Sequence, residues 1–353
     1  MKPTRSCLLA LTLCLSSLPA FAQQPPQVPA PNAVPLKLRV EHTTVLVGQA
    51  PQMMLLPARC DGRGNYYVRF FSGSKPEKSP VRAFKQDGVQ TAVFALVGLE
   101  FDRPGFGAID FAVTKDGRVY VLADGEGGSY IVEFNPDGTM KSKVQLAVDF
   151  NALHFGAFES GKFLVVGVDR ETPTNLDPHS PYTAVFGKDG SIIAKVVFPE
   201  DKQYEAAANR GDPDFFDSQR IGGGNFAVEN GTVVQSSDGN VFVVRWTRPT
   251  RVYAVSDMGQ VIRAFEVDSG LGDRKPSAVH ESAGKLAIQF AAERADPRSL
   301  LKVVSSNGEE LATYDAQGAG VAFACYSAPE RFTFFTAGPD NLQLTSMDGP
   351  HRP

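Results

Sequence analysis

The feature that most constrains the fold is a two-residue turn ending in glycine that recurs along the chain. Asn-Gly and Asp-Gly between apolar segments are the strongest short-range signals of a β-hairpin. Six such turns follow one another at intervals of 41 to 69 residues: Asp87-Gly88, Asp137-Gly138, Asp189-Gly190, Met258-Gly259, Asn307-Gly308 and Asp348-Gly349. The recurrence of one hairpin at this spacing predicts a repeat architecture.

A second element precedes each hairpin, namely a short apolar segment rich in aromatic and β-branched residues. The segments at 118–123 (RVYVLA) and 240–244 (NVFVV) are typical, and each follows a glycine. This composition is typical of β-strands. Nearly every position is apolar, which indicates that neighbouring sheets cover both faces. Each unit is therefore expected to hold a first strand, a tight turn, a buried strand, a variable loop and a closing hairpin.

Six units of this kind predict an all-β fold, a six-bladed β-propeller with four-stranded antiparallel blades. The 33 glycines and 25 prolines agree with a turn-rich β protein. A two-sheet sandwich is the alternative, but it gives no reason for the repeat. The sixth unit ends at Gly349 without an outer strand, whereas Leu36 to Val40 alternates apolar and polar residues outside any complete unit. We therefore expect the N-terminal strand to close the last blade and to cover its exposed edge.

The first 22 residues have the pattern of a secretory signal peptide. Two basic residues precede a short apolar stretch, and small residues at positions 20 and 22 provide a cleavage site. The stretch is too short to span a membrane, so we expect no membrane span and a periplasmic or secreted protein; an uncleaved anchor is the alternative. Residues 23–35 contain five prolines and are expected to form a linker. The propeller is then expected at 36–349 and a short tail at 350–353.

Two cysteines, Cys60 and Cys325, remain in the expected mature chain. Each comes just before the buried strand of its unit, in blades one and six, which are neighbours only if the ring closes. Disulfides form in the oxidising compartments that exported proteins reach, so we expect a Cys60–Cys325 bridge; two separate thiols are the alternative. The formal net charge of −4 does not indicate the basic surface of a nucleic-acid-binding protein. We therefore expect no nucleic-acid partner.

The repeats also resemble those of known propellers. Residues 115–121 (KDGRVYV) followed by 134–138 (FNPDG) are similar to repeats of six-bladed propellers of the NHL and TolB-like superfamily, of the exported bacterial type. The resemblance covers 36–349 and implies the architecture. It leaves the activity open, because that superfamily includes protein-binding scaffolds, lactonase-like hydrolases and lyases.

Unequal loop lengths distinguish the two faces of the expected disc. Short turns join strands one to two and three to four on one face, which we call the short-turn face. The opposite, long-loop face receives the loops between strands two and three and the connections between blades. The longest connection, Pro199 to Gly231, contains an expected helix at 200–209 and a candidate lid that contacts a partner; a plain surface insertion is the alternative. The candidate lid residues are Asp212, Asp214, Phe215, Phe216, Asp217 and Arg220.

Asp110 and His154 are the candidate catalytic pair. They occupy equivalent positions in the first strands of blades two and three, so we expect them close together near the central funnel. An Asp-His pair can act as general acid and base, or bind a divalent metal such as Ca or Zn. The alternative is that backbone groups near the axis satisfy both side chains.

These observations favour a scaffold over an enzyme, one that binds an envelope protein, a peptide or a glycan through its long-loop face. Nucleophile motifs such as G-x-S-x-G and H-E-x-x-H are absent from the sequence, and no cofactor is expected. The alternative function is that of a metal-dependent small-molecule hydrolase or lyase with Asp110 and His154 in the central funnel. The sequence leaves the oligomeric state open.

Overall fold

The computed structural model describes residues 34–350, except positions 51, 72–74, 170–180, 211–219, 222–224, 227–230, 248, 273, 293–295, 321 and 328. One compact unit spans Pro35–Pro353. The expected signal peptide (1–22) lies outside the described residues, as do nearly all of the expected linker and tail. Within the described ranges, no helix is long and apolar enough to cross a membrane.

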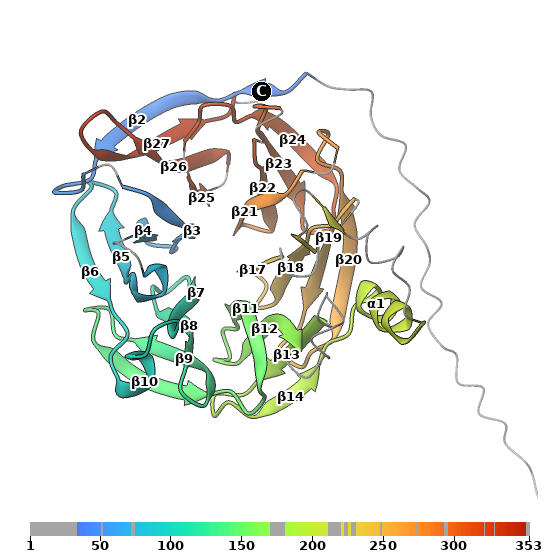
Figure 1. Cartoon of the computed structure of the whole chain (residues 1–353). Coiled ribbons are helices and arrows are strands. Elements are labelled where there is room, and N and C mark those ends of the chain that lie inside the picture. Colours follow the sequence, from blue (N-terminus) through green and yellow to red (C-terminus); the bar gives the residue numbers. More distant parts are fainter. Residues whose placement is uncertain are drawn as a thin grey trace, which may run out of the picture. The chain divides into compact units, whose positions relative to one another are not determined.

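Six four-stranded antiparallel sheets form blades around a central axis (Figure 1), which confirms the predicted propeller. The innermost strands of blades one to six are β3 (Met54–Cys60), β7 (Gly107–Val113), β11 (Phe150–Ala157), β17 (Thr232–Gln235), β21 (Pro276–Ser282) and β25 (Ala322–Ser327). The second strands are β4 (Asn65–Phe70), β8 (Val119–Gly125), β12 (Phe163–Asp169), β18 (Val241–Arg245), β22 (Lys285–Phe290) and β26 (Arg331–Ala337).

The two outer layers of strands follow the same order around the ring. The third strands are β5 (Val81–Lys85), β9 (Gly128–Phe134), β13 (Pro181–Phe186), β19 (Thr250–Val255), β23 (Leu300–Ser305) and β27 (Leu342–Asp348). The outer strands are β6 (Gln90–Phe94), β10 (Met140–Gln145), β14 (Ile192–Lys195), β20 (Val261–Val267), β24 (Glu310–Asp315) and β2 (Arg39–Val45). The remaining elements are β1 (Leu36–Lys37), η1 (Pro76–Lys78), η2 (Leu99–Phe101), α1 (Pro199–Arg210), β15 (Arg220–Ile221) and β16 (Asn225–Phe226).

The recurring turn glycine has a double structural role. Gly138 lies between β9 and β10 with φ at +90°, a conformation that other residues rarely adopt. A Cβ atom added at Gly138 would lie 2.2 Å from the carbonyl oxygen of Val93, on the outer strand of the preceding blade. The glycine is therefore required both by the hairpin and by the close approach of one blade to the next.

Blade six is closed by the N-terminal strand, as predicted, but with shifted bounds. Strand β2 pairs antiparallel with β27, from Arg39 opposite Asp348 onward, and Figure 1 shows these two strands side by side. The expected strand began at Leu36, but β1 instead pairs in parallel with β24 of blade five, with Leu36 opposite Tyr314. The partly buried side chains of Leu36 and Leu38 pack into the core cluster that contains Tyr314. Burial of these leucines between blades five and six accounts for the shift.

The expected disulfide also joins the two ends of the ring. Cys60 at the end of β3 is bonded to Cys325 on β25, with 5.4 Å between the two Cα atoms. Aromatic side chains fill the spaces between adjacent blades. Phe94 of blade one meets Phe134 of blade two edge to face, with ring centroids 5.7 Å apart. A disulfide thus closes the ring covalently, and aromatic side chains fill the spaces between its blades.

Candidate functional site

The two candidate catalytic residues are brought together near the ring axis. The Nδ1 atom of His154 on β11 lies 3.4 Å from Oδ2 of Asp110 on β7. The side chain of Asp110 is 2% exposed and that of His154 is 27% exposed. Equivalent positions on neighbouring first strands are therefore close in space, as the repeat predicted.

Backbone groups hold the Asp110 carboxylate in place. Oδ1 accepts a hydrogen bond from the amide of Phe111 at 2.8 Å, and Oδ2 accepts one from the amide of Phe155 at 3.3 Å. Burial by itself raises the pKa of Asp110. The contact with His154, the charge of Arg59 and the Phe111 amide outweigh burial and hold this pKa below its usual value.

These two side chains do not fit a calcium or zinc site by themselves. Such ions take four or more ligands in proteins, whereas each oxygen of Asp110 already accepts a backbone hydrogen bond. Over the described residues, no group of three or more His, Cys, Asp or Glu side chains is placed to hold a metal ion.

Arg59 crosses the axis close to Asp110. It is 6% exposed at the end of β3, and its Nη2 donates a hydrogen bond of 3.1 Å to the carbonyl of Val233 on β17. Blades one and four stand opposite each other in a ring of six, so this hydrogen bond spans the centre. Burial lowers the pKa of Arg59, and the nearby Asp110 charge opposes that effect. The guanidinium is one of two buried positive charges that act on Asp110, the other being that of Arg69.

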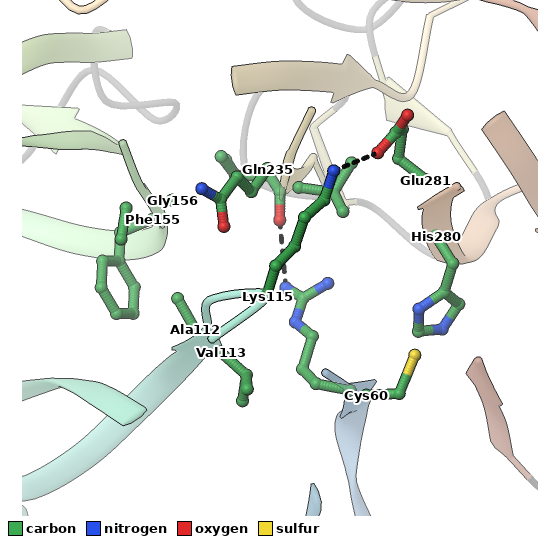
Figure 2. A pocket seen from close by; sticks show the side chains of 13 residues that line it. Cys60, Ala112, Val113, Lys115, Phe155, Gly156, Gln235, His280 and Glu281 are labelled. Carbon is green, nitrogen blue, oxygen red and sulfur yellow. Dashed lines mark hydrogen bonds and ion pairs between the residues drawn. The ribbon is translucent and has the colours of Figure 1, made fainter. Parts of the chain in front are cut away.

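A pocket of about 70 Å³ opens at the axis where the first strands of blades one to five end. These strand ends lead into the turns between first and second strands, so the pocket lies on the short-turn face. Figure 2 shows Lys115 of blade two reaching across the pocket toward Glu281 of blade five. Its polar lining residues are Arg59, Lys115, Gln235, His280 and Glu281. Asp110 and His154 are not among its lining residues.

The sequence did not point to this axial pocket. Its charged members lie at the carboxyl ends of first strands, next to the turns used to define the repeat. A charged residue beside a turn is ordinarily exposed. The available signal was the repeat itself, which places the corresponding strand ends of all blades at one opening.

On the long-loop face, helix α1 is held by buried charges. Asp201 accepts a hydrogen bond of 2.7 Å from Arg245, and both side chains are almost fully buried. Glu200 accepts hydrogen bonds from the Tyr253 hydroxyl at 2.6 Å and from Arg251 at 2.9 Å. Arg251 also contacts Glu266 on β20 at 3.1 Å, and Figure 1 places α1 beside that strand. The helix is thus attached firmly to blade four.

The expected helix at 200–209 is therefore present as α1. One side of it packs inward through Asp201, Tyr204 and Ala207, which recur every three residues along one helix face. Its exposed residues are Lys202, Gln203, Glu205, Ala206, Asn209 and Arg210. Of the candidate lid, Asp212, Asp214, Phe215, Phe216 and Asp217 lie outside the described residues, and the Arg220 backbone forms β15 with Ile221.

A second hollow of about 150 Å³ lies between blades one and two on the same face. Two cations, the buried Arg69 and the exposed Lys78, hold the segments that line it. Arg69 donates to the carbonyls of Ser79, Pro76 and Ala108 at 3.1, 2.7 and 2.9 Å, and Lys78 donates to the carbonyl of Phe101 in η2. The long-loop face therefore carries a preformed hollow as well as a helix.

Comparison with known proteins identifies the fold. No protein-family model and no curated protein matches the sequence. A calcium-binding protein, regucalcin from Agrobacterium tumefaciens, is 14% identical with a TM-score of 0.50, over 90% of this chain and 97% of that one. A Dyadobacter fermentans protein of unknown function is 11% identical with a TM-score of 0.49, over 88% and 99% of the two chains.

Virginiamycin B lyase from Staphylococcus aureus is 12% identical with a TM-score of 0.44, over 88% of this chain and 99% of that one. The likeness to regucalcin, with its TM-score of 0.50 at 14% identity, shows the fold alone. The chain is a six-bladed β-propeller, and its activity has to be inferred from its own residues.

Proposed function

We propose that this chain is an exported propeller scaffold that binds an envelope protein, a peptide or a glycan through its long-loop face. The observation that carries the proposal is the attachment of α1. The buried Asp201–Arg245 pair fixes one side of the helix to blade four, while the opposite side exposes polar side chains. A rigid, polar, outward-facing helix needs no rearrangement to meet a partner, and such preorganisation favours binding.

Two further features support the proposal. The hollow between blades one and two lies on the same face, so a partner could contact both. The disulfide between blades one and six suits an oxidising compartment, which agrees with export.

Site-specific photo-crosslinking tests the choice of face. A photo-reactive residue at Gln203, exposed on α1, is compared with one at Asn307, exposed in a short turn of the opposite face. We expect crosslinked species from position 203 and none from position 307. Protease and glycosidase treatment of the product then distinguishes a protein or peptide from a glycan. Crosslinks from position 307 alone, or from neither position, contradict the proposal.

The second candidate function is a metal-dependent small-molecule hydrolase or lyase in the central funnel. The 3.4 Å contact of Asp110 with His154 is the observation in its favour, and it would need metal ligands beyond these two side chains. Metal analysis of protein purified without chelators tests it. This function requires that the wild type contains a stoichiometric divalent ion and that His154→Asn loses it. The control variant His42→Asn should retain the ion, because His42 is an exposed residue on β2. Protein without such an ion contradicts this function and leaves the scaffold proposal unaffected.

A further inference from the structure

The axial pocket on the short-turn face contains a carboxylate with one unused oxygen. Oε1 of Glu281 accepts hydrogen bonds from the Ser237 hydroxyl at 2.6 Å and from the Gly284 amide at 2.7 Å. Oε2 is buried and has no hydrogen-bond partner among the described residues. The Glu281 side chain as a whole has no exposed area. Because a buried polar atom without a partner is costly, this oxygen indicates a place that a ligand donor would complete.

The nearest cation is close but not hydrogen-bonded to that oxygen. Lys115 Nζ lies 3.8 Å from Oε2 of Glu281, and the lysine side chain is 45% exposed at the mouth of the pocket. A hydrogen bond between nitrogen and oxygen requires about 3 Å. Figure 2 shows the two side chains extending toward each other from opposite sides of the opening. The two charged groups therefore attract each other electrostatically, but no hydrogen bond joins them.

A second cation, Arg59, lines the pocket. Within the described part of the chain, its guanidinium makes one hydrogen bond, from Nη2 to Val233. A guanidinium carries five N–H donors, so donors remain for an acidic group. The pocket thus combines one carboxylate, Glu281, with two cations, Lys115 and Arg59.

Charge and size together define the ligand. A simple cation would satisfy Glu281 but repel Lys115 and Arg59, and a simple anion would leave Oε2 unpaired. A zwitterion satisfies both sides without a net charge. The volume of about 70 Å³ has room for roughly five to seven water-sized groups, which corresponds to the non-hydrogen atoms of a very small amino acid. Ala112, Val113 and Ala157 supply apolar walls for its carbon atoms.

We propose that this pocket binds a small zwitterionic α-amino acid, with the ammonium group on Glu281 Oε2 and the carboxylate on Lys115 and Arg59. On binding, the half-exposed Lys115 would move away from Glu281, so that one long contact of 3.8 Å is replaced by two hydrogen-bonded contacts with the ligand. This site lies on the face opposite to α1 and does not depend on the proposed scaffold function.

Calorimetric titration of the purified protein with glycine and with alanine tests the proposal. Acetate and methylammonium serve as half-ligands that carry only one charge, and leucine serves as an oversized amino acid. We expect glycine or alanine to bind about tenfold or more tightly than each half-ligand, since charge-assisted hydrogen bonds contribute at least that factor. Leucine should also bind more weakly, because its side chain does not fit a pocket of about 70 Å³.

Two substitutions remove one charge each while keeping the side-chain size. Glu281→Gln retains an acceptor for Ser237, and Lys115→Met alters a half-exposed residue; each should weaken glycine binding about tenfold or more. Lys141→Met is the matched control, because Lys141 is 53% exposed and pairs with Glu133 away from the pocket. It should leave binding unchanged.

Each other outcome overturns the proposal. Acetate binding as tightly as glycine indicates an anion site, and methylammonium binding as tightly indicates a cation site. No heat of binding for glycine or alanine, or equal binding by Lys115→Met and wild type, indicates that the ion pair is only structural. Circular dichroism shows whether each variant is folded, and Lys115→Met alone decides the question if Glu281→Gln does not fold.

Discussion

His280 gives the protein a specific sensitivity to acid. It is 4% exposed on β21, and its Nε2 lies 3.1 Å from the carbonyl oxygen of Phe323 on β25. A carbonyl only accepts hydrogen bonds, so the neutral ring carries its proton on Nε2. Burial, followed by the nearby positive charge of Arg59, lowers the pKa of His280 from 6.5 to about 3. The folded protein therefore keeps this ring neutral through the mildly acidic range.

The sign of the effect on stability follows from this lowered pKa. In the unfolded chain the histidine binds a proton below about pH 6.5, whereas in the folded protein it does not until about pH 3. Between these values the unfolded state binds the extra proton, so the free energy of unfolding falls as the pH falls. From His280 alone, the loss between pH 7 and pH 5 amounts to about 2 kcal/mol, and it reaches about 3 kcal/mol at pH 4.

Urea unfolding at pH 7 and at pH 5 measures this loss in the wild type and in His280→Asn. Any cost of the substitution that does not depend on pH cancels in the difference between the two conditions. The loss should be about 2 kcal/mol smaller in His280→Asn. The matched control is His42→Asn, which replaces an exposed histidine on β2 and should lose as much as the wild type. An equal loss in His280→Asn and wild type would refute the reasoning.

Three further predictions concern the ring and its helix. Replacing both cysteines of the disulfide by serine should lower the free energy of unfolding by about 5 kcal/mol in the chain-entropy model, because the bridge spans 265 residues; an unchanged urea midpoint contradicts this. Arg245→Met should cost about 3–5 kcal/mol by leaving Asp201 buried without its partner, and adding Asp201→Asn should recover part of that loss in the same assay. Gly138→Ala should destabilise the folded protein more than Gly239→Ala. Both glycines have positive φ, but only at position 138 does the new Cβ lie 2.2 Å from a backbone oxygen. Equal decreases of the melting temperature in the two variants would show that the contact between blades is unimportant at Gly138.

The blades could be predicted from the sequence because the same glycine is needed both for the turn of its hairpin and for packing against the preceding blade. Gly190 has φ at +80°, and a Cβ there would lie 2.0 Å from the carbonyl oxygen of Gln145 in the preceding blade. The hairpin needs the glycine for its turn, and the ring needs it for packing. A local motif therefore carried information about the arrangement of whole blades, and equivalent positions such as Asp110 and His154 could be placed together.

Contacts between opposite blades follow no such repeat. Arg59 and Val233 are separated by 174 residues, and their hydrogen bond depends on the length of one side chain across the axis. The start of β2 is a similar case. Alternation of apolar and polar residues marks a strand near Leu36, but the change of partner from β24 to β27 is set by packing of Leu36 and Leu38 between two blades. The periodicity of the sequence therefore indicates neither the contact of Arg59 with Val233 across the axis nor the point at which the N-terminal strand changes its partner.

The charged groups at the axis and those on α1 differ in the size of the partner that they can accommodate. Lys115 and Glu281 project from opposite blades into a pocket of about 70 Å³, so the ligand proposed there has to be small. The polar side of α1 faces outward, and the buried Asp201–Arg245 pair fixes the helix without using that side. The size of a partner there is not limited by the ring. A small zwitterion on the short-turn face and a macromolecule on the long-loop face would therefore not exclude each other.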